Sequence, residues 1–409
     1  MAHFRPLTRT ATTWLAAGAL ALVGAGKPAQ ARDLFSSLSP LGSGVDDGRV
    51  RLAGKAEGAP EHHHAEQKIP GDLTTLSLEQ LMELEVVPIN VLGGHTHPAG
   101  QWMVGYRYMF THQGDNLVGT NEVSTRRLLR RYLLAPDSMD MEMHMLEGMY
   151  APTDRLTLML MVPYSRMWME KQSLFSSGGG HGHGAATPDP IALGAAGPNA
   201  PRKVESRSAG WGDLTLMSLY TFSGSSDSGR RLLFNGGLSV PTGSIHQGHA
   251  SGRHEYMMQL GSGTVDLLPG ITYLGENRSL SWGAQAMGTV RLGTNDVGYS
   301  LGNRLRLNAW SSYRLTDWFA PSLRLEGQVW GNIHGQDPTL DPLVDPTFDP
   351  GKYGGRRVDL LLGANVFVPK GKWKGTRLSV EGGFPVYQNL DGPQLETDWT
   401  IGFSLSYSR

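Results

Sequence analysis

Residues 398–407 of the chain read Asp-Trp-Thr-Ile-Gly-Phe-Ser-Leu-Ser-Tyr, an alternation with a period of two residues. Every second side chain from Trp399 to Tyr407 is apolar, and the side chains between them are small or polar. Successive side chains of a β-strand point to opposite faces, so this stretch predicts a strand with one apolar and one polar face. A length of about 10 residues is enough for a tilted strand to cross a bilayer.

The same alternation recurs along the chain from residue 102 onward. In one example Leu156, Leu158 and Leu160 alternate with Thr157 and Met159. We predict twelve strands from these runs, at 102–110, 139–150, 156–168, 213–222, 231–240, 263–273, 280–292, 303–314, 319–330, 357–368, 376–385 and 398–407.

The connections between these runs alternate in length. Short connections follow the even-numbered runs, at 151–155, 223–230, 274–279, 315–318 and 369–375. Long connections follow most odd-numbered runs, at 169–212, 241–262 and 331–356. Outer-membrane barrels have short periplasmic turns and long external loops. The sequence therefore predicts an all-β fold, an antiparallel transmembrane β-barrel of about 12 strands over residues 101–409, with both termini in the periplasm.

Composition excludes several other classes of protein. Lys and Arg number 36 against 37 Asp and Glu, so the net charge of −1 argues against nucleic acid as a partner. The sequence contains no cysteine, which excludes a disulfide scaffold and thiolate metal sites. The only long apolar run lies at the N-terminus, so a bundle of membrane helices is also excluded, because each span needs about 20 apolar residues.

The N-terminus has the pattern of a secretory signal peptide over residues 1–31. Arg5 and Arg9 precede an apolar stretch over 14–26, and Ala29-Gln30-Ala31 has the small-x-small pattern at which signal peptidase cleaves. We therefore expect an exported protein in the outer membrane of a Gram-negative bacterium.

Residues 32–100 lack a sustained period and predict a flexible periplasmic segment. Within it, Ser77 and Gln80 form a capping-box pattern, and Leu78 and Leu81 fall on one helical face. We predict one short amphipathic helix near 77–86. The sequence leaves open whether this segment plugs the barrel or binds a periplasmic partner.

The face opposite the apolar one is expected to line the barrel lumen. Both charge signs occur on it in similar number, which fits either ion pairs that fill the interior or a narrow polar channel. The predicted function is a passive or plug-gated channel for a small solute, and a closed structural barrel is an alternative. The predicted lumen-lining residues are Arg107, Glu142, His144, Arg304, Arg306, Arg324, Glu326, Asp359, Arg377 and Glu381.

Methionine and histidine suggest a further alternative, a barrel that binds or handles a metal of the copper type. The chain has 17 Met and 14 His, and thioether and imidazole groups suit Cu(I). If Glu142 and His144 face the lumen, Met141, Met143 and Met145 face lipid. A candidate metal site then consists of Met103, His144, Met159 and Met161. No other cofactor is expected.

An enzyme is not expected. No G-x-S-x-G motif occurs, and Ser251 lies near His249 and His254 in a connection rather than on a strand. The tracts His62–His64 and His181/His183 predict only solvated, weakly metal-binding segments.

Several stretches resemble a group of proteobacterial outer-membrane proteins described as transporter-like and related to the outer-membrane proteins of the phenol meta-cleavage pathway. The resemblance implies a barrel and a transport role, with outer-membrane lipid, a small solute and the outer-membrane assembly machinery as partners. The chain departs from barrels that end on an aromatic residue, because Ser408 and Arg409 follow Tyr407. The stretches that carry the resemblance are 100–109 (GQWMVGYRYM), 141–145 (MEMHM), 149–159 (MYAPTDRLTLM), 259–264 (QLGSGT) and 391–399 (DGPQLETDW).

Overall fold

The computed structural model describes residues 87–88, 91–173, 202–225, 229–249 and 252–409. The chain divides into two units, 1–69 and 70–409, and every described residue belongs to the second. The predicted signal peptide, the predicted helix over 77–86 and both solvated histidine tracts lie outside the described residues. No helix among the described residues is long and apolar enough to span a bilayer.

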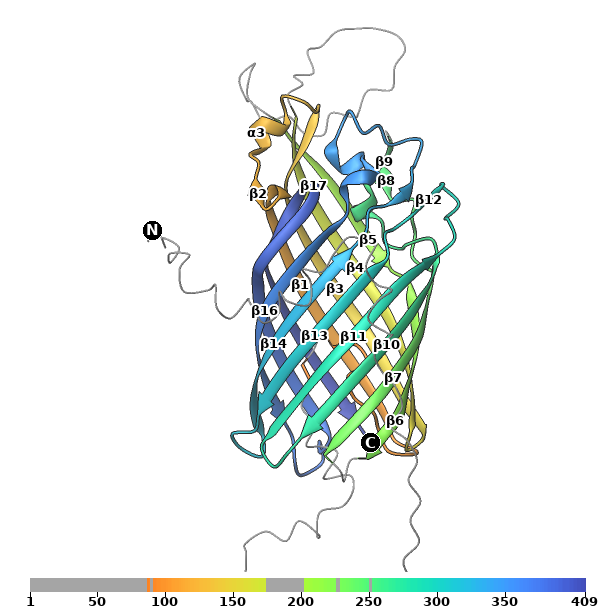
Figure 1. Ribbon diagram of the computed structural model, residues 1–409, viewed down its shortest axis with the longest axis vertical. Coiled ribbons are helices and arrows are strands. Elements are labelled where there is room, and N and C mark those ends of the chain that lie inside the picture. The colour runs from red at the N-terminus through yellow and green to blue at the C-terminus, as the bar shows by residue number, and fades with distance from the viewer. Residues whose placement is uncertain (1–86, 89–90, 174–201, 226–228, 250–251) are drawn as a thin grey trace, which may run out of the picture. The chain divides into compact units, whose positions relative to one another are not determined.

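The described strands close into an antiparallel barrel (Figure 1), as the alternation predicted. Eleven strands form the ring, and the last of them, β17, pairs with the first, β1. In ring order they are β1 (Trp102–Gly119), β3 (Leu134–Thr153), β4 (Leu156–Ser173), β6 (Leu214–Ser225), β7 (Arg230–Val240), β10 (Val265–Glu276), β11 (Leu280–Leu292), β13 (Arg304–Tyr313), β14 (Phe319–Trp330), β16 (Gly355–Phe367) and β17 (Thr376–Ser408).

Strand β17 passes along the wall twice. It is 33 residues long, and its first half pairs with β16 as far as Leu390. Its second half, from Gln394 to Ser408, pairs with β1. Counted as passes of the chain, the wall therefore has the predicted number, because β17 contains both of the last two predicted runs.

The observed strands differ from the predicted runs mainly at one end of β1, β3 and β4. These strands continue past the predicted ends at residues 110, 139 and 168. Directly past residue 110 the side chains of β1 are polar on both faces, as at His112 and Gln113, so the backbone pairing continues where the hydrophobic alternation has ended. For the same reason the alternation gave no sign of β5 (Arg202–Trp211), a polar strand that pairs with the far half of β4.

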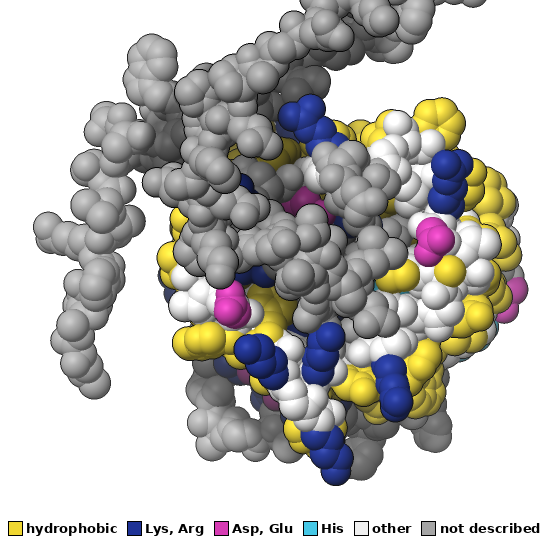
Figure 2. Space-filling model, turned by 90° about the horizontal axis from the view of Figure 1, so that it is seen from below, with side chains coloured by type: hydrophobic (Ala, Val, Ile, Leu, Met, Phe, Trp, Pro, Cys, Tyr) yellow, Lys and Arg dark blue, Asp and Glu magenta, His cyan; other side chains and the backbone are white. Residues whose placement is uncertain are grey.

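The outer face of the barrel is apolar and the inner face is mixed. Leucine, valine and aromatic side chains are exposed along every strand of the ring, as the rim of hydrophobic groups in Figure 2 illustrates. Trp102 and Tyr407 pack edge to face at one end of the barrel, with ring centroids 5.8 Å apart. The buried side of the wall holds many polar and charged groups instead. This distribution fits a barrel surrounded by hydrocarbon.

The first and last strands meet at the same end of the barrel. Trp102 N–H donates to Arg409 O, and Arg409 N–H donates to Trp102 O, both at 2.9 Å. The final residues after Tyr407 therefore continue the pairing with β1 and are part of the wall.

The long connections fold over the opposite end of the barrel (Figure 1). Tyr256, Tyr299, Ile333 and Leu340 form a small core among them. Lys171 at the end of β4 reaches Glu255 at 2.9 Å and Asp345 at 2.8 Å, and all three side chains are buried. The connections contain β2 (Asn121–Glu122), α3 (Thr125–Leu128), β8 (Gly248–His249), β9 (Gly252–Arg253), η3 (Tyr256–Met258), β12 (Tyr299–Ser300), β15 (His334–Gly335), η4 (Pro346–Phe348) and η5 (Pro350–Lys352).

Candidate functional site

A segment preceding β1, with described residues 87–88 and 91–101, lies inside the barrel. Hydrogen bonds from inward-facing side chains hold it. Asn235 Nδ2 donates to Gly93 O at 2.9 Å, and Gln285 Nε2 donates to Leu92 O at 2.7 Å. Arg231 Nη1 donates to Thr96 Oγ1 at 3.0 Å. We call these described residues the luminal segment.

The luminal segment crosses from one side of the barrel to the other. Arg377 on β17 donates to Val87 O, and the N–H of His97 donates to Thr157 Oγ1 on β4 at 3.1 Å. Between these points the segment packs on apolar side chains of three further strands. Val87 and Val91 form a buried cluster with Leu233, Leu274 and Trp310. The prediction of a flexible periplasmic segment up to residue 100 is therefore wrong for its last part, because these wall contacts hold that part inside the lumen.

Gly93 is the tightest point of the luminal segment. Its φ of +60° is a conformation that L side chains rarely adopt. A Cβ at this position would lie 2.5 Å from Leu219 Cδ2 and 2.9 Å from Asn235 Nδ2. The backbone can approach the wall this closely only because residue 93 has no side chain.

One side of the lumen, on β13, β14, β16 and β17, is lined by ion pairs and amides. We call it the charged wall. Arg324 is at its centre and is 1% exposed. Its guanidinium donates to both carboxylate oxygens of Glu381 at 2.9 Å, to Asn308 Oδ1 at 2.8 Å and to Glu326. A bidentate arrangement of this kind satisfies charges that would otherwise be costly to bury.

Further pairs continue the charged wall above and below Arg324. Arg306 Nε lies 3.5 Å from Glu326 Oε1, and Arg357 Nε lies 3.0 Å from Asp359 Oδ2. Arg377 Nη2 donates to Asn365 Oδ1 at 2.8 Å. The contacts of Arg306 and Arg377 cross between neighbouring strands, and that of Arg357 lies within β16.

The structure places most of the predicted lumen-lining residues on the inner face. Arg107 on β1 pairs there with Glu147, with Arg107 Nη2 and Glu147 Oε2 3.0 Å apart. Arg304 stacks on Trp330 at the loop end of the wall, with its guanidinium carbon 5.8 Å from the ring centroid. The inner-face residues among those predicted are Arg107, Arg304, Arg306, Arg324, Glu326, Asp359, Arg377 and Glu381.

Glu142 and His144 lie on the outer face, which corrects the prediction that they line the lumen. In β3 they share their parity with Leu146 and Tyr150, whose side chains are 52% and 51% exposed. The opposite parity holds Glu147 and the buried Met149. Methionine misled the parity argument because it is apolar and suits either lipid or a protein interior. The aromatic Tyr150 was the signal that could have set the parity correctly.

On the outer face these two residues form part of a polar group with tyrosines. His144 Nδ1 and Tyr106 OH are 2.7 Å apart, and Tyr108 OH donates to Glu142 Oε1 at 3.2 Å. Arg166 Nη1 lies 3.6 Å from Glu142 Oε2. His144 is therefore separated by the barrel wall from the other three residues of the predicted metal site.

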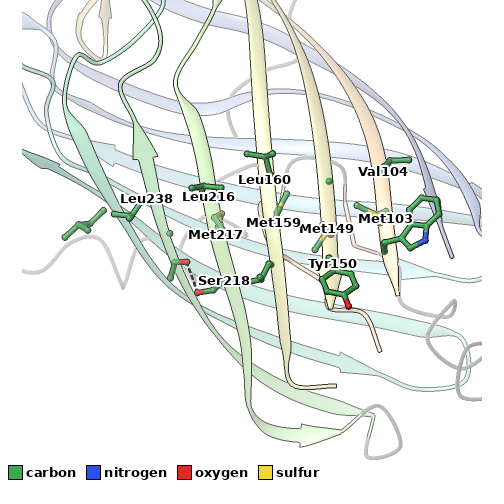
Figure 3. Close-up of a pocket in the computed structure, with 16 residues that line it drawn as sticks. Met103, Val104, Met149, Tyr150, Met159, Leu160, Leu216, Met217, Ser218 and Leu238 are labelled. Atoms are coloured by element: carbon green, nitrogen blue, oxygen red, sulfur yellow. Dashed lines mark hydrogen bonds between the residues drawn. The ribbon is translucent and has the colours of Figure 1, made fainter. Parts of the chain in front are cut away.

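The side of the lumen opposite the charged wall is lined by methionine. Met103, Met149, Met159 and Met217 lie directly opposite one another on β1, β3, β4 and β6. Figure 3 shows these four side chains on neighbouring strands. We call them the methionine row. Directly opposite residues on paired strands have Cβ atoms about 5 Å apart, so their thioethers lie within reach of one another.

The methionine row belongs to a larger apolar surface. It is part of one buried cluster with Met161, Leu219 and Met287. A pocket of about 760 Å³ at these strands is lined by the four residues of the row, by outer-face side chains such as Tyr150 and Leu160, and by residues of β7 and β10 (Figure 3). Towards the loop end, Met139, Met167, Met169 and Met258 form a second buried cluster, in which Met258 comes from η3. Strands β1, β3, β4 and β6 thus form a methionine wall.

The luminal segment brings two histidines beside this wall. The rings of His95 and His97 pack edge to face, with centroids 5.1 Å apart. Burial lowers the pKa of His97 to about 4, and burial together with the neighbouring His97 holds the pKa of His95 well below its usual value. Both imidazoles are therefore neutral at physiological pH.

Among the described residues, no three His, Cys, Asp or Glu side chains are grouped as ligands of a metal ion. A metal site in this part of the chain would therefore depend on thioether ligands. Of the four predicted ligands, the structure brings Met103, Met159 and Met161 together and leaves out His144.

No protein-family model and no curated protein matches the chain. Among solved structures, it is similar to the COG4313 outer membrane channel from Pseudomonas putida F1, with a TM-score of 0.52 and 15% identity over 80% of this chain and 100% of that one. A Pseudomonas aeruginosa FadL homologue matches with a TM-score of 0.33 and 13% identity, over 75% of this chain and 89% of that one. At this identity the first similarity establishes the fold, that of an outer-membrane β-barrel.

Proposed function

We propose that the protein is an outer-membrane channel for a small solute and that the luminal segment gates it. The observation that carries the proposal is a lumen with two unlike walls, crossed by a segment of the same chain that a few hydrogen bonds hold in place. A barrel needed only as a scaffold would have no reason to hold its own backbone across the lumen. The similarity in fold to an outer membrane channel supports the same proposal.

The location follows from the same proposal. The apolar outer face suits outer-membrane lipid, and the end that carries both Trp102 and the C-terminus would face the periplasm. The long connections at the other end would then lie outside the cell, as in other barrels of this class. Protease treatment of intact cells that carry an epitope tag after Gly252 tests this orientation, because only an external loop is cleaved there.

Conductance in planar bilayers tests the channel. We expect small or rare openings for the full chain and larger, more frequent openings for Gly93→Val, because the new side chain collides with Leu219 and Asn235 and displaces the luminal segment. Gly252→Val is the matched control, since a Cβ at Gly252 has no atom within 4 Å.

A silent bilayer with both the full chain and Gly93→Val would contradict the channel. That result would favour the alternative of a closed structural barrel. Equal conductance for Gly93→Val and the full chain would leave a channel but remove the gating role of the luminal segment.

A further inference from the structure

Methionine is confined to the inside of this barrel. Among the described residues, none of the exposed large hydrophobic side chains is a methionine, although leucine, valine, isoleucine, phenylalanine and tryptophan all occur there. On β3, residues Met139, Met141, Met143, Met145 and Met149 all share the inward parity. Leucine also occurs on the inner face, as at Leu219, but the large apolar side chains that β1 turns inward up to Met109, and that β3 and β4 turn inward between residues 139 and 169, are methionines. The thioether is therefore concentrated on this part of the wall.

The methionine row brings thioethers together at one level of the barrel. Met103, Met149 and Met159 are 4%, 3% and 4% exposed, and Met217 is also 4% exposed. The end of one of them is beside the luminal segment, since a Cβ on Gly93 would lie 3.4 Å from Met217 Cε. Four flexible side chains on adjacent strands can direct three or four sulfur atoms to a common point.

His97 of the luminal segment is bound next to the strand that carries Met159, and its imidazole has a nitrogen without a hydrogen-bond partner among the described residues. Its backbone N–H is bound to Thr157 Oγ1, and Thr157 precedes Met159 by two residues on the same face of β4. The imidazole is 8% exposed, and its side chain is hydrogen-bonded to Gln101. Within the described part of the chain, Nε2 of His97 has no hydrogen-bond partner. A buried imidazole nitrogen without a partner is rare, and a metal ion would satisfy it.

We propose that Met103, Met149, Met159 and Met217 of the methionine row, together with His97 of the luminal segment, bind a soft monovalent cation of the Cu(I) type. Thioether sulfur and neutral imidazole nitrogen are the ligands that Cu(I) prefers, and hard cations prefer oxygen. The site needs no carboxylate, in keeping with the absence of a group of acidic and histidine ligands in the described residues. It replaces the predicted site by exchanging His144 for His97 and Met161 for two further members of the row.

The inference goes beyond the proposed channel and does not depend on it. Equilibrium binding of a cation requires no conductance, so a silent bilayer would leave the site untouched. Conversely, a channel without the site would conduct but bind no Cu(I) at the row.

The test measures affinity for Cu(I) in the detergent-solubilised full chain, under anaerobic conditions and in competition with a chromophoric Cu(I) chelator. Ag(I), which has the same preference for sulfur and no redox chemistry in this setting, serves as a second probe by calorimetry. The key variant carries Met103→Leu, Met149→Leu and Met159→Leu, which keep the volume and apolar character of the wall. We expect its affinity to fall by at least about 100-fold, the upper end of what losing an outer-shell group costs a metal site.

Two matched controls separate the site from the rest of the chain. The variant Met139→Leu, Met167→Leu, Met169→Leu alters the second methionine cluster, and His144→Leu removes the histidine on the outer face. Both should bind as the wild type does, and all these variants retain the tract His62–His64. Heat-modifiable migration on gels confirms that each barrel is folded.

X-ray absorption at the copper edge provides a readout that folding defects do not imitate. The wild type should show sulfur and nitrogen scatterers, and His97→Leu should lose the nitrogen and keep the sulfur. Wild-type affinity in the folded triple variant of the row would overturn the proposal. An equal loss in the second-cluster control, or a copper edge with no sulfur scatterers, would also overturn it.

Discussion

The two walls of the lumen differ in how they satisfy the side chains that they bury inside the barrel. The charged wall on β13, β14, β16 and β17 buries groups of both signs and satisfies them in pairs, as Arg324 does with Glu326 and Glu381. The methionine wall on β1, β3, β4 and β6 buries mainly thioethers, which need no partner, beside the ion pair of Arg107 and Glu147. The first is rigid because each charge depends on its neighbours, and the second is adaptable because each thioether can turn independently. A solute between them meets fixed charges on one side and a soft surface on the other.

The largest effect is expected from removing the centre of the charged wall. Arg324→Leu leaves Glu326 and Glu381 buried without their main counterion, and breaking a buried pair typically costs about 3–5 kcal/mol. Urea unfolding of the protein in lipid vesicles measures this loss. A change below about 1 kcal/mol, the range of exposed pairs, would mean that water in the lumen screens the wall and that it is not rigid.

A smaller effect is expected from acidification, which acts on the luminal segment between the walls. With the luminal segment bound in the lumen, His97 has a pKa of about 4, below the ordinary 6.5. Between these two pH values, His97 therefore binds a proton when the segment is displaced into water and stays neutral when the segment is bound. The luminal segment is therefore held most strongly above pH 6.5. As the pH falls from 6.5 towards 4, the free energy that holds it in the lumen decreases by up to about 3 kcal/mol. Besides burial, the nearby Arg231 contributes to this low pKa of His97, because it opposes the added charge.

Conductance between pH 7.5 and pH 4.5 measures this effect, and it should rise on acidification. The matched control is His97→Gln, which cannot titrate and should flatten the response. A rise that persists unchanged in that variant would place the pH sensor elsewhere in the chain.

The smallest effect is expected from the methionine wall. Met161→Leu conserves volume in a surface that depends on no partner, so the free energy of unfolding should change by less than about 1.5 kcal/mol. The same urea measurement applies, with Arg324→Leu as the reference. A loss as large as that of the arginine variant would show that the methionines are packed as rigidly as the ion pairs.

The same contrast explains which features could be predicted from the sequence. The charged wall followed from parity alone, because Arg324 and Glu326 can face only the inside of a membrane barrel. On β3 the alternation gave the wrong orientation. Methionine occupies one face and Glu142 and His144 the other, and methionine suits either lipid or the lumen. The luminal segment could not be found at all, since Val91 and Gly93 have no periodicity and their partners are distant in sequence.

The candidate site shows the same limit. Met103, Met159 and Met161 lie on the inside as predicted, because they alternate with clearly outward side chains, Trp102 and Val104 on β1 and leucines on β4. The contribution of His97 depends on how the chain folds back through the barrel, and spacing along one strand carries no information about that. The polar strand β5 was missed for a different reason, because hydrophobic alternation reports contact with lipid and not backbone pairing.

The seam between Trp102 and Arg409 has a consequence for how the molecule forms. The wall is complete only when the end of the chain hydrogen-bonds with a strand that begins some 300 positions earlier. A chain that stops before the second half of β17 would expose two rows of unpaired amides, a state that hydrocarbon does not tolerate. Closure of the wall must therefore await the second half of β17, and loss of a few residues from this half should be more damaging to biogenesis than a deletion of equal size in an external loop.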